Sequence, residues 1–340
     1  LSYPGLSYEL DVFGKLANQT QASRWEALAS EQDLQATAQS LIAITAQLYW
    51  QLGYLNERLS VANQNLASTQ KTYELVQTQY RAGAVSGLDL TSAEQAVQSQ
   101  KASLSQIEQQ KVEARTALAV LLNIPVQQLN INEPAKLPQS KLPEISSGLP
   151  AELLSRRPDL KATELRLRKA LANKDANKAS YYPSISLTGS FTTGGSSTSL
   201  TQVLSNPAAI LGAGLSLPFL QWNDMKRDLK VNELEYEKSI IQYRQTMYKA
   251  FADVENALSA RNELDKQVAL QERNVQLAEK TKQQTKKHYN KNKIPLKNLL
   301  DAQKTAREAR LSLVQTKQSQ YNAYVTLMQA LGGSPIKQLP

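Results

Sequence analysis

The feature that most constrains this chain is a run of mostly apolar residues at heptad spacing. Steps of four and three residues alternate without interruption through Leu48, Leu52, Leu55, Leu59, Ala62, Leu66, Thr69, Tyr73, Val76 and Tyr80. This spacing places one side of a long helix against a neighbouring helix. Between residues 16 and 82 only Gly53 disfavours a helix. We therefore expect one helix of 67 residues there, roughly 100 Å long at about 1.5 Å per residue.

A second helix is expected to fold back on the first. Residues 83–87 read Gly-Ala-Val-Ser-Gly, which predicts a tight turn. The heptad spacing then continues from 88 to 122 through Leu90, Ala93, Val97, Leu104, Ile107, Ala114, Leu118 and Leu121. The two segments therefore predict a helical hairpin.

The same arrangement returns after a shift of 209 residues. Long and return helices are expected at 223–291 and 296–331, and the shift aligns Tyr80 with Tyr289, Gly83 with Asn292, Val85 with Ile294, Leu90 with Leu299, Ala93 with Ala302 and Leu122 with Leu331. Asn is the residue that best replaces Gly in a left-handed backbone conformation. We interpret the two hairpins as products of a duplication.

Three short segments alternate between apolar and small or polar residues. They lie at 6–12, 184–193 and 211–219, and residues 194–198 between the last two predict a polar turn. Strict alternation indicates strands with two unlike faces. Such a pattern is typical of a strand in a membrane barrel and equally of a half-buried strand in a soluble protein.

Proline divides the remainder of the chain. Five prolines between 124 and 150 predict an irregular connector, and Pro150 and Pro158 each suit the first turn of a helix, the second ending near Ala179. The expected plan is a first repeat (1–123), a connector (124–157), a helix with a strand hairpin (158–222), a second repeat (223–333) and a tail (334–340).

Helix lengths suggest a further segment. The first long helix matches the return helix and the helix after Pro158 laid end to end, whereas the second long helix has a partner for only half its length. We expect an additional helix and strand before Leu1 in the full protein.

Composition argues against an enzyme. The chain has no Cys and one His, His288, which excludes disulfides and thiolate metal sites and argues against a His-based site. No nucleophile–base set, metal cluster or phosphate-binding loop is present, so we expect no catalytic residue, metal or cofactor. No window of about eighteen apolar residues predicts a transmembrane helix. The net charge of +9 indicates either solvated helix faces or a surface for an acidic partner or nucleic acid.

Several motifs resemble those of the outer-membrane efflux protein family, which includes the TolC and OprM channel-tunnels. They are the Leu-Leu-Ser-Arg-Arg-Pro-Asp run at 153–159, followed by Glu164, Leu167, Ala170 and the segment 182–187, together with the segments 8–14 and 330–333. The resemblance covers nearly the whole chain and is closer to the multidrug and metal efflux branch. It implies a mainly α fold with a small membrane β-barrel portion. Three copies would close into a helical barrel that crosses the periplasm.

This resemblance also implies a function without catalysis. The protein would be a passive duct in the outer membrane, in contact with its lipid and fed by a periplasmic adaptor and an inner-membrane pump. It would not bind nucleic acid. The turns of both hairpins would dock the adaptor, through Gly83, Val85, Ser86, Gly87, Asn292, Ile294 and Pro295.

The resemblance places a gate at the same end. Tyr289 matches a tyrosine that reaches toward an acidic residue, here Asp89, and Tyr80 is the counterpart of Tyr289 in the first repeat. Asp301 matches a position whose carboxylates ring the pore. Two positions depart from the family pattern: Asn298 stands at the second acidic ring position, and Ile294 replaces an arginine that forms an ionic lock.

Each of these residues has a purely structural alternative. The two tyrosines continue apolar seams, and Asp89 and Asp301 lie near helix starts, where a carboxylate stabilises the helix N-terminus. The lysine-rich segment 280–297 is either a solvated helix end or a basic collar for an acidic adaptor. Alternative functions are a periplasmic adaptor and a coiled-coil scaffold. Two hairpins without a lipoyl-like domain disfavour the adaptor, and the alternating strands disfavour the scaffold.

Overall fold

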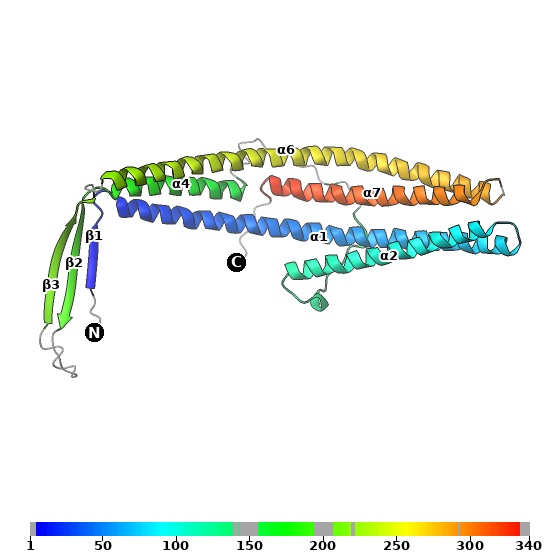
Figure 1. Cartoon of the computed structure of the whole chain (residues 1–340), viewed down its shortest axis with the longest axis horizontal. Helices are drawn as coiled ribbons and strands as arrows, with labels where there is room; N and C mark the ends of the chain where they lie inside the picture. The colour runs from blue at the N-terminus through cyan, green and yellow to red at the C-terminus, as the bar shows by residue number, and fades with distance from the viewer. Residues whose placement is uncertain are drawn as a thin grey trace. The chain divides into compact units, whose positions relative to one another are not determined.

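The computed structural model describes residues 5–138, 142, 156–193, 207–218, 222–291 and 293–333. Its elements, in order, are β1 (Gly5–Leu10), α1 (Lys15–Arg81), α2 (Gly87–Leu121), the short 3-10 helix η1 (Val126–Gln128), α4 (Pro158–Ala179), β2 (Ser184–Thr193), β3 (Pro207–Ser216), α6 (Trp222–Tyr289) and α7 (Leu296–Ala330) (Figure 1). The predicted long helices, return helices and strands are all present. The turn at 194–198, the helix at Pro150 and the tail after 333 lie outside the described residues.

The sheet has the order β1-β2-β3, and both neighbouring pairs are antiparallel. Tyr8 lies opposite Leu187, which lies opposite Ala213, so the apolar positions of all three strands share one face. β1 ends earlier than expected because the Asp11 carboxylate accepts hydrogen bonds from the backbone N–H groups of Leu16 and Ala17, at 2.9 and 2.7 Å. These bonds satisfy donors at the start of α1 and end the strand.

The heptad run of α1 forms a buried stripe, as predicted. Leu52, Leu55 and Val76 are fully buried, and Ala62 and Thr69 are nearly so. Tyr80 is the exception, with 45% of its surface exposed. The hydrophobic spacing therefore predicted the packed face correctly except at the last residue before the turn.

Two compact units share the chain. The first comprises Leu1–Ala36 and Arg157–Ala250, and the second comprises Thr37–Arg156 and Phe251–Pro340. In the first unit, ion pairs and a hydrogen bond fasten α4 to its neighbours on both sides. On one side, Arg166 pairs with Asp33 of α1 and Lys169 pairs with Glu26 of α1 at 3.0 Å. On the other side, the hydroxyl of Tyr181, two residues after α4, donates a hydrogen bond to Asp228 of α6 at 2.8 Å.

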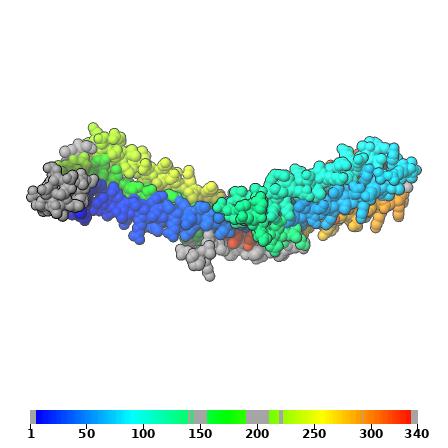
Figure 2. Space-filling view, turned by 90° about the horizontal axis from the view of Figure 1, so that it is seen from below, coloured from blue at the N-terminus to red at the C-terminus, as the bar shows by residue number. Residues whose placement is uncertain are grey.

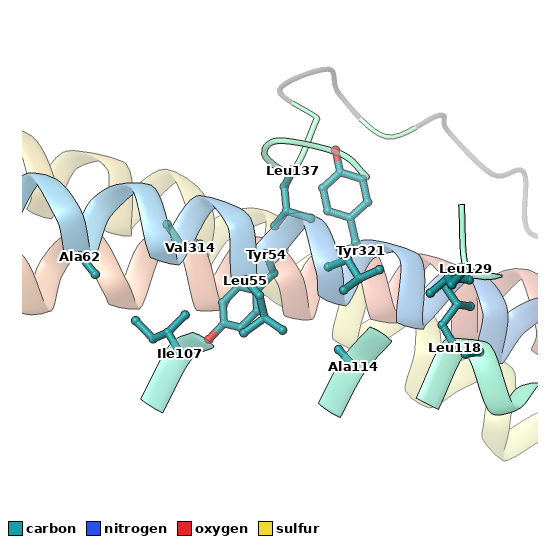
Figure 3. Close-up of a cluster of buried hydrophobic side chains, with 12 residues drawn as sticks. Tyr54, Leu55, Ala62, Ile107, Ala114, Leu118, Leu129, Leu137, Val314 and Tyr321 are labelled. Atoms are coloured by element: carbon teal, nitrogen blue, oxygen red, sulfur yellow. The ribbon is translucent and has the colours of Figure 1, made fainter. Parts of the chain in front are cut away.

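The largest core of the second unit lies where α1, α2 and α7 meet the connector (Figure 3). Leu137 of the connector packs there with Leu55 of α1 and Tyr321 of α7, whose hydroxyl donates a hydrogen bond to the Pro138 carbonyl at 2.8 Å. The connector also explains Gly53, since a Cβ at that position would lie 3.0 Å from the Pro134 ring. A glycine inside a long helix is thus required by the close approach of another segment.

The duplication is visible in the backbone. α2 and α7 each have 35 residues, and their first residues, Gly87 and Leu296, are 209 positions apart. At the aligned positions after the two helices, Asn123 with φ 54° and Gly332 with φ 89° take the left-handed conformation, and Gly333 with φ 66° does so as well. An Asn-for-Gly exchange of the expected kind therefore occurs at the ends of the return helices. The exchange expected at Asn292 lies outside the described residues.

None of the helices in the described part of the chain contains a stretch apolar enough to cross a membrane.

Gly332→Ala should destabilise the full-length protein by about 2–3 kcal/mol, because the left-handed conformation is strained for alanine. In addition, a Cβ there would lie 2.9 Å from the backbone carbon of Arg156. Gly83→Ala is the matched control, with φ 71° but nothing within 4 Å of its Cβ, and should cost about 1 kcal/mol. The free energy of unfolding in urea, followed by helical circular dichroism, measures both. Equal losses would contradict the steric account.

Candidate functional site at the hairpin tips

The turns of the two hairpins lie side by side within the second unit. Figure 2 shows the first tip, in cyan, beside the second, in orange. A small apolar cluster joins them and contains buried residues from all four helices: Val76, Ala93, Tyr289, Leu296 and Leu299. This tip cluster has five buried residues, against twelve in the core at the connector. Apolar packing therefore holds the tips together less strongly than the middle of the hairpins.

Tyr289 links the two hairpins directly. Its ring is buried in the tip cluster, and its hydroxyl donates a hydrogen bond to Oε1 of Gln79 on α1 at 2.6 Å. Burial, and secondly the negative charge of Asp89, raise the pKa of the Tyr289 phenol above its ordinary value. Tyr289 therefore stays neutral and remains a donor over a wide pH range.

Asp89 does not accept the hydrogen bond that the resemblance implied. Its carboxylate forms a capping box at the start of α2, accepting from the backbone N–H of Ser86 at 3.1 Å and from the Ser86 hydroxyl at 2.8 Å. The structural alternative, stabilisation of a helix N-terminus, thus describes the observed contacts of Asp89. Its charge still acts on the Tyr289 phenol through space.

The other predicted gate residues lie at the surface. Asp301 and Asn298 are exposed on α7. The structural alternative for Asp301 was stabilisation of the α7 N-terminus. That alternative is wrong, because α7 has no acidic residue in its first turn. Tyr80 is largely exposed, with its ring near Gly87 of the same hairpin. The two tyrosines that the repeat aligns therefore occupy different environments.

The turn residues divide into two groups. Gly83, Ser86, Gly87 and Pro295 are exposed, whereas Val85 and Ile294, which the repeat aligns, are partly buried against the tip cluster. Asn292 lies outside the described residues. Each turn thus anchors one aliphatic side chain inward and presents the rest of its surface outward.

A row of side-chain hydrogen bonds continues from the tip along α1 and α7; we call it the inter-hairpin seam. Its pairs are Gln303 to Thr72 at 2.9 Å, Arg310 to Gln64 at 3.4 Å, Tyr54 to Gln315, and Gln318 to Gln51. Polar pairs also occur within each hairpin, for example Arg58 with Gln110 at 3.0 Å in the first and Arg310 with Glu279 at 2.7 Å in the second. Polar hydrogen bonds between the hairpins exchange with water more readily than an apolar core separates.

Sequence reasoning did not find Gln79, Thr72 or Gln303. Gln and Thr are frequent throughout the helices, and nothing in their spacing distinguishes a residue of the seam from a solvated one. Thr72 directly precedes the heptad residue Tyr73, and its burial depends on α7 lying beside α1. No group of His, Cys, Asp or Glu that could hold a metal ion occurs among the described residues.

Solved structures with the same fold include outer membrane channels. A membrane protein from Pseudomonas aeruginosa superposes with a TM-score of 0.89 at 29% identity, over 97% of this chain and 74% of that one. The open-state MtrE outer membrane channel of Neisseria gonorrhoeae gives a TM-score of 0.82 at 30% identity, over 96% and 74%. The fold is therefore that of a TolC-like outer-membrane channel, which confirms the fold class predicted from the sequence.

The sequence comparisons define the family. The model of the outer membrane efflux protein family matches residues 2–123 and 149–333. The pyoverdine export outer membrane protein OpmQ of Pseudomonas putida is 33% identical over 96% of this chain and 69% of its own length. The chain belongs to the outer membrane efflux protein family and is an outer-membrane protein. The resemblance inferred from the motifs is confirmed.

The Tyr289 phenol should ionise above the ordinary tyrosine range near pH 10. Because its folded pKa is raised, the stabilisation it provides is present below the unfolded value and is lost as the pH rises through the folded value. The difference in absorbance at 295 nm between the wild type and Tyr289→Phe reports this titration. Asp89→Asn should move it to lower pH. A titration unaffected by Asp89→Asn would contradict the assigned through-space effect.

Proposed function

We propose that the protein is the outer-membrane channel of a tripartite efflux system, a passive duct opened and closed at its hairpin tips. Family membership and the channel fold of its relatives support this role. The relatives are named for different cargoes, including pyoverdine, toluene and cations. We therefore assign the choice of substrate to an inner-membrane pump.

The functional form is a homotrimer, in which three copies close around an aqueous passage. The exposed apolar face of the sheet supports contact with the lipid of the outer membrane. Leu6, Leu211 and Leu215 on that face are 80%, 89% and 65% exposed in the single chain. The opposite face carries Ser186 and Thr188 beside Gly212 and Gly214, and suits the water-filled side.

The remaining parts have supporting roles in this proposal. The segment 158–222 brings the strand hairpin to the membrane, and we propose that residues 124–150 and the C-terminal tail contribute to a belt. A periplasmic adaptor docks on the exposed turn residues, including Gly83, Ser86 and Pro295, and Asn298 and Asp301 face the pore.

One observation carries the gating part of the proposal. Near their turns the two hairpins are joined to each other only by hydrogen bonds such as Tyr289 to Gln79 and Gln303 to Thr72 and by the small tip cluster, among the described residues, whereas the larger apolar core joins them at the connector. A hydrogen bond of this kind contributes about 1 kcal/mol, because water replaces it when it breaks. In this proposal, adaptor docking separates these few bonds while each hairpin stays intact.

The channel role is tested by conductance. The purified full-length protein, reconstituted in planar bilayers, should give discrete single-channel steps and should migrate as a trimer after mild cross-linking. A monomer that does not conduct would overturn the proposal.

The gate is tested by removing hydrogen bonds between the two hairpins. Tyr289→Phe combined with Gln303→Leu removes two inter-hairpin hydrogen bonds, worth about 2 kcal/mol together, and should favour the open state by roughly 30-fold. The matched control is Tyr80→Phe, which alters the aligned but exposed tyrosine and should leave gating unchanged. Open probability in the same bilayers is the measurement. Equal open probability in both variants would exclude a gating role for these hydrogen bonds.

A further inference from the structure

The two tips differ strongly in charge. The first tip, residues 71–101, has three basic and three acidic residues and is formally neutral. The aligned segment of the second hairpin, residues 280–310, has ten Lys and Arg against two acidic residues, a formal charge of +8 with His288 neutral. The whole chain carries +9. The basic character of the protein is therefore concentrated at one of two otherwise equivalent tips.

Five lysines form the exposed part of this charge, and we call them the basic tip: Lys286, Lys287, Lys291, Lys293 and Lys297. Within the part of the chain that the structure describes, none of the five forms an ion pair. Their neighbour Lys282 is paired with Glu279 at 2.6 Å. The basic tip thus presents its charge to the surroundings of the chain.

Part of this charge opposes the stability of the helix that carries it. Lys297 lies in the first turn of α7, where the helix dipole is positive. That helix start has no acidic residue, and Pro295 provides no side-chain cap. The aligned helix α2 instead has the Ser86–Asp89 capping box. Lys286 and Lys287, at the end of α6, do suit the dipole there, so helix stability accounts for some of the lysines but not for Lys297.

We infer that the basic tip is a docking surface for a protein partner that presents a cluster of acidic side chains. This inference rests on the proposed function, since the tips are then where the periplasmic partner binds. In a closed trimer, neutral and basic tips would alternate around the ring. A partner with an acidic cluster would distinguish the two positions, which fixes its register on the channel, because charge complementarity selects partners and orientation.

The test compares two variants with the same change in charge. The first replaces all five lysines of the basic tip with Gln. The control replaces five exposed basic residues outside both tips that have no ion pair among the described residues: Arg24, Lys178, Lys238, Arg244 and Lys249. The probe is a soluble helical-hairpin peptide with four glutamates in its turn, and a hairpin with glutamines at those positions serves as the blank. Fluorescence anisotropy with the full-length channel gives Kd at 50 mM and 500 mM salt.

We expect the basic-tip variant to weaken binding of the acidic hairpin by roughly 30-fold at low salt, and the control by less than about threefold. At high salt the difference should shrink, because the Debye length falls to a few ångströms. Equal weakening in both variants would overturn the inference. Tighter binding of polyphosphate or of phosphatidylglycerol vesicles than of the acidic hairpin would also overturn it, since the surface would then be a general anion site.

Conductance of the same preparations separates this inference from the proposed function. A basic-tip variant that conducts normally but binds the acidic hairpin as tightly as the wild type overturns only the docking surface. A wild type that neither trimerises nor conducts overturns the channel role itself.

Discussion

The structure depends on the packing of two 35-residue return helices against long helices of 67 and 68 residues. In folded proteins most of the stability of a helix comes from packing an apolar stripe against a neighbour and not from helix propensity. Leu52, Leu55 and Val76 of α1 supply such a stripe, which α2 covers with residues such as Ile107 and Leu118. Each return helix therefore covers part of the apolar stripe that its long helix needs.

The two hairpins meet through polar and apolar contacts that are distributed unevenly along their length. Gln, Thr and Tyr side chains join α1 to α7, with apolar packing concentrated at the connector and in a small cluster at the tips. Tyr321 and Leu137 close the larger core, where the connector crosses the hairpins. Strong packing in the middle with weaker contacts at one end is the arrangement that a gate at the tips requires.

The duplication produced two tips with the same backbone plan, but their side chains now differ in burial, hydrogen bonding and helix capping. Tyr289 is buried and bonded to Gln79, while its counterpart Tyr80 is exposed. The first return helix begins with a capping box, whereas the second begins at Pro295 with a lysine in its first turn. The backbone conformation of the two copies is more alike than their side chains are. Asn123 and Gly332, which the repeat aligns, both have a left-handed φ.

The sequence by itself determined the helices, the alternating strands, the duplication and the family. These follow from local periodicity and from motifs in which neighbouring residues carry the information, and the boundaries were correct to within a few residues. It did not determine which side chains meet between the hairpins. Asp89 was expected to bind Tyr289 but caps its own helix, because a serine three residues away is nearer than a partner on another hairpin. Gln79 binds the tyrosine only because tertiary packing places α1 beside the end of α6, and a glutamine on a solvated helix looks the same in the sequence as one in a buried seam.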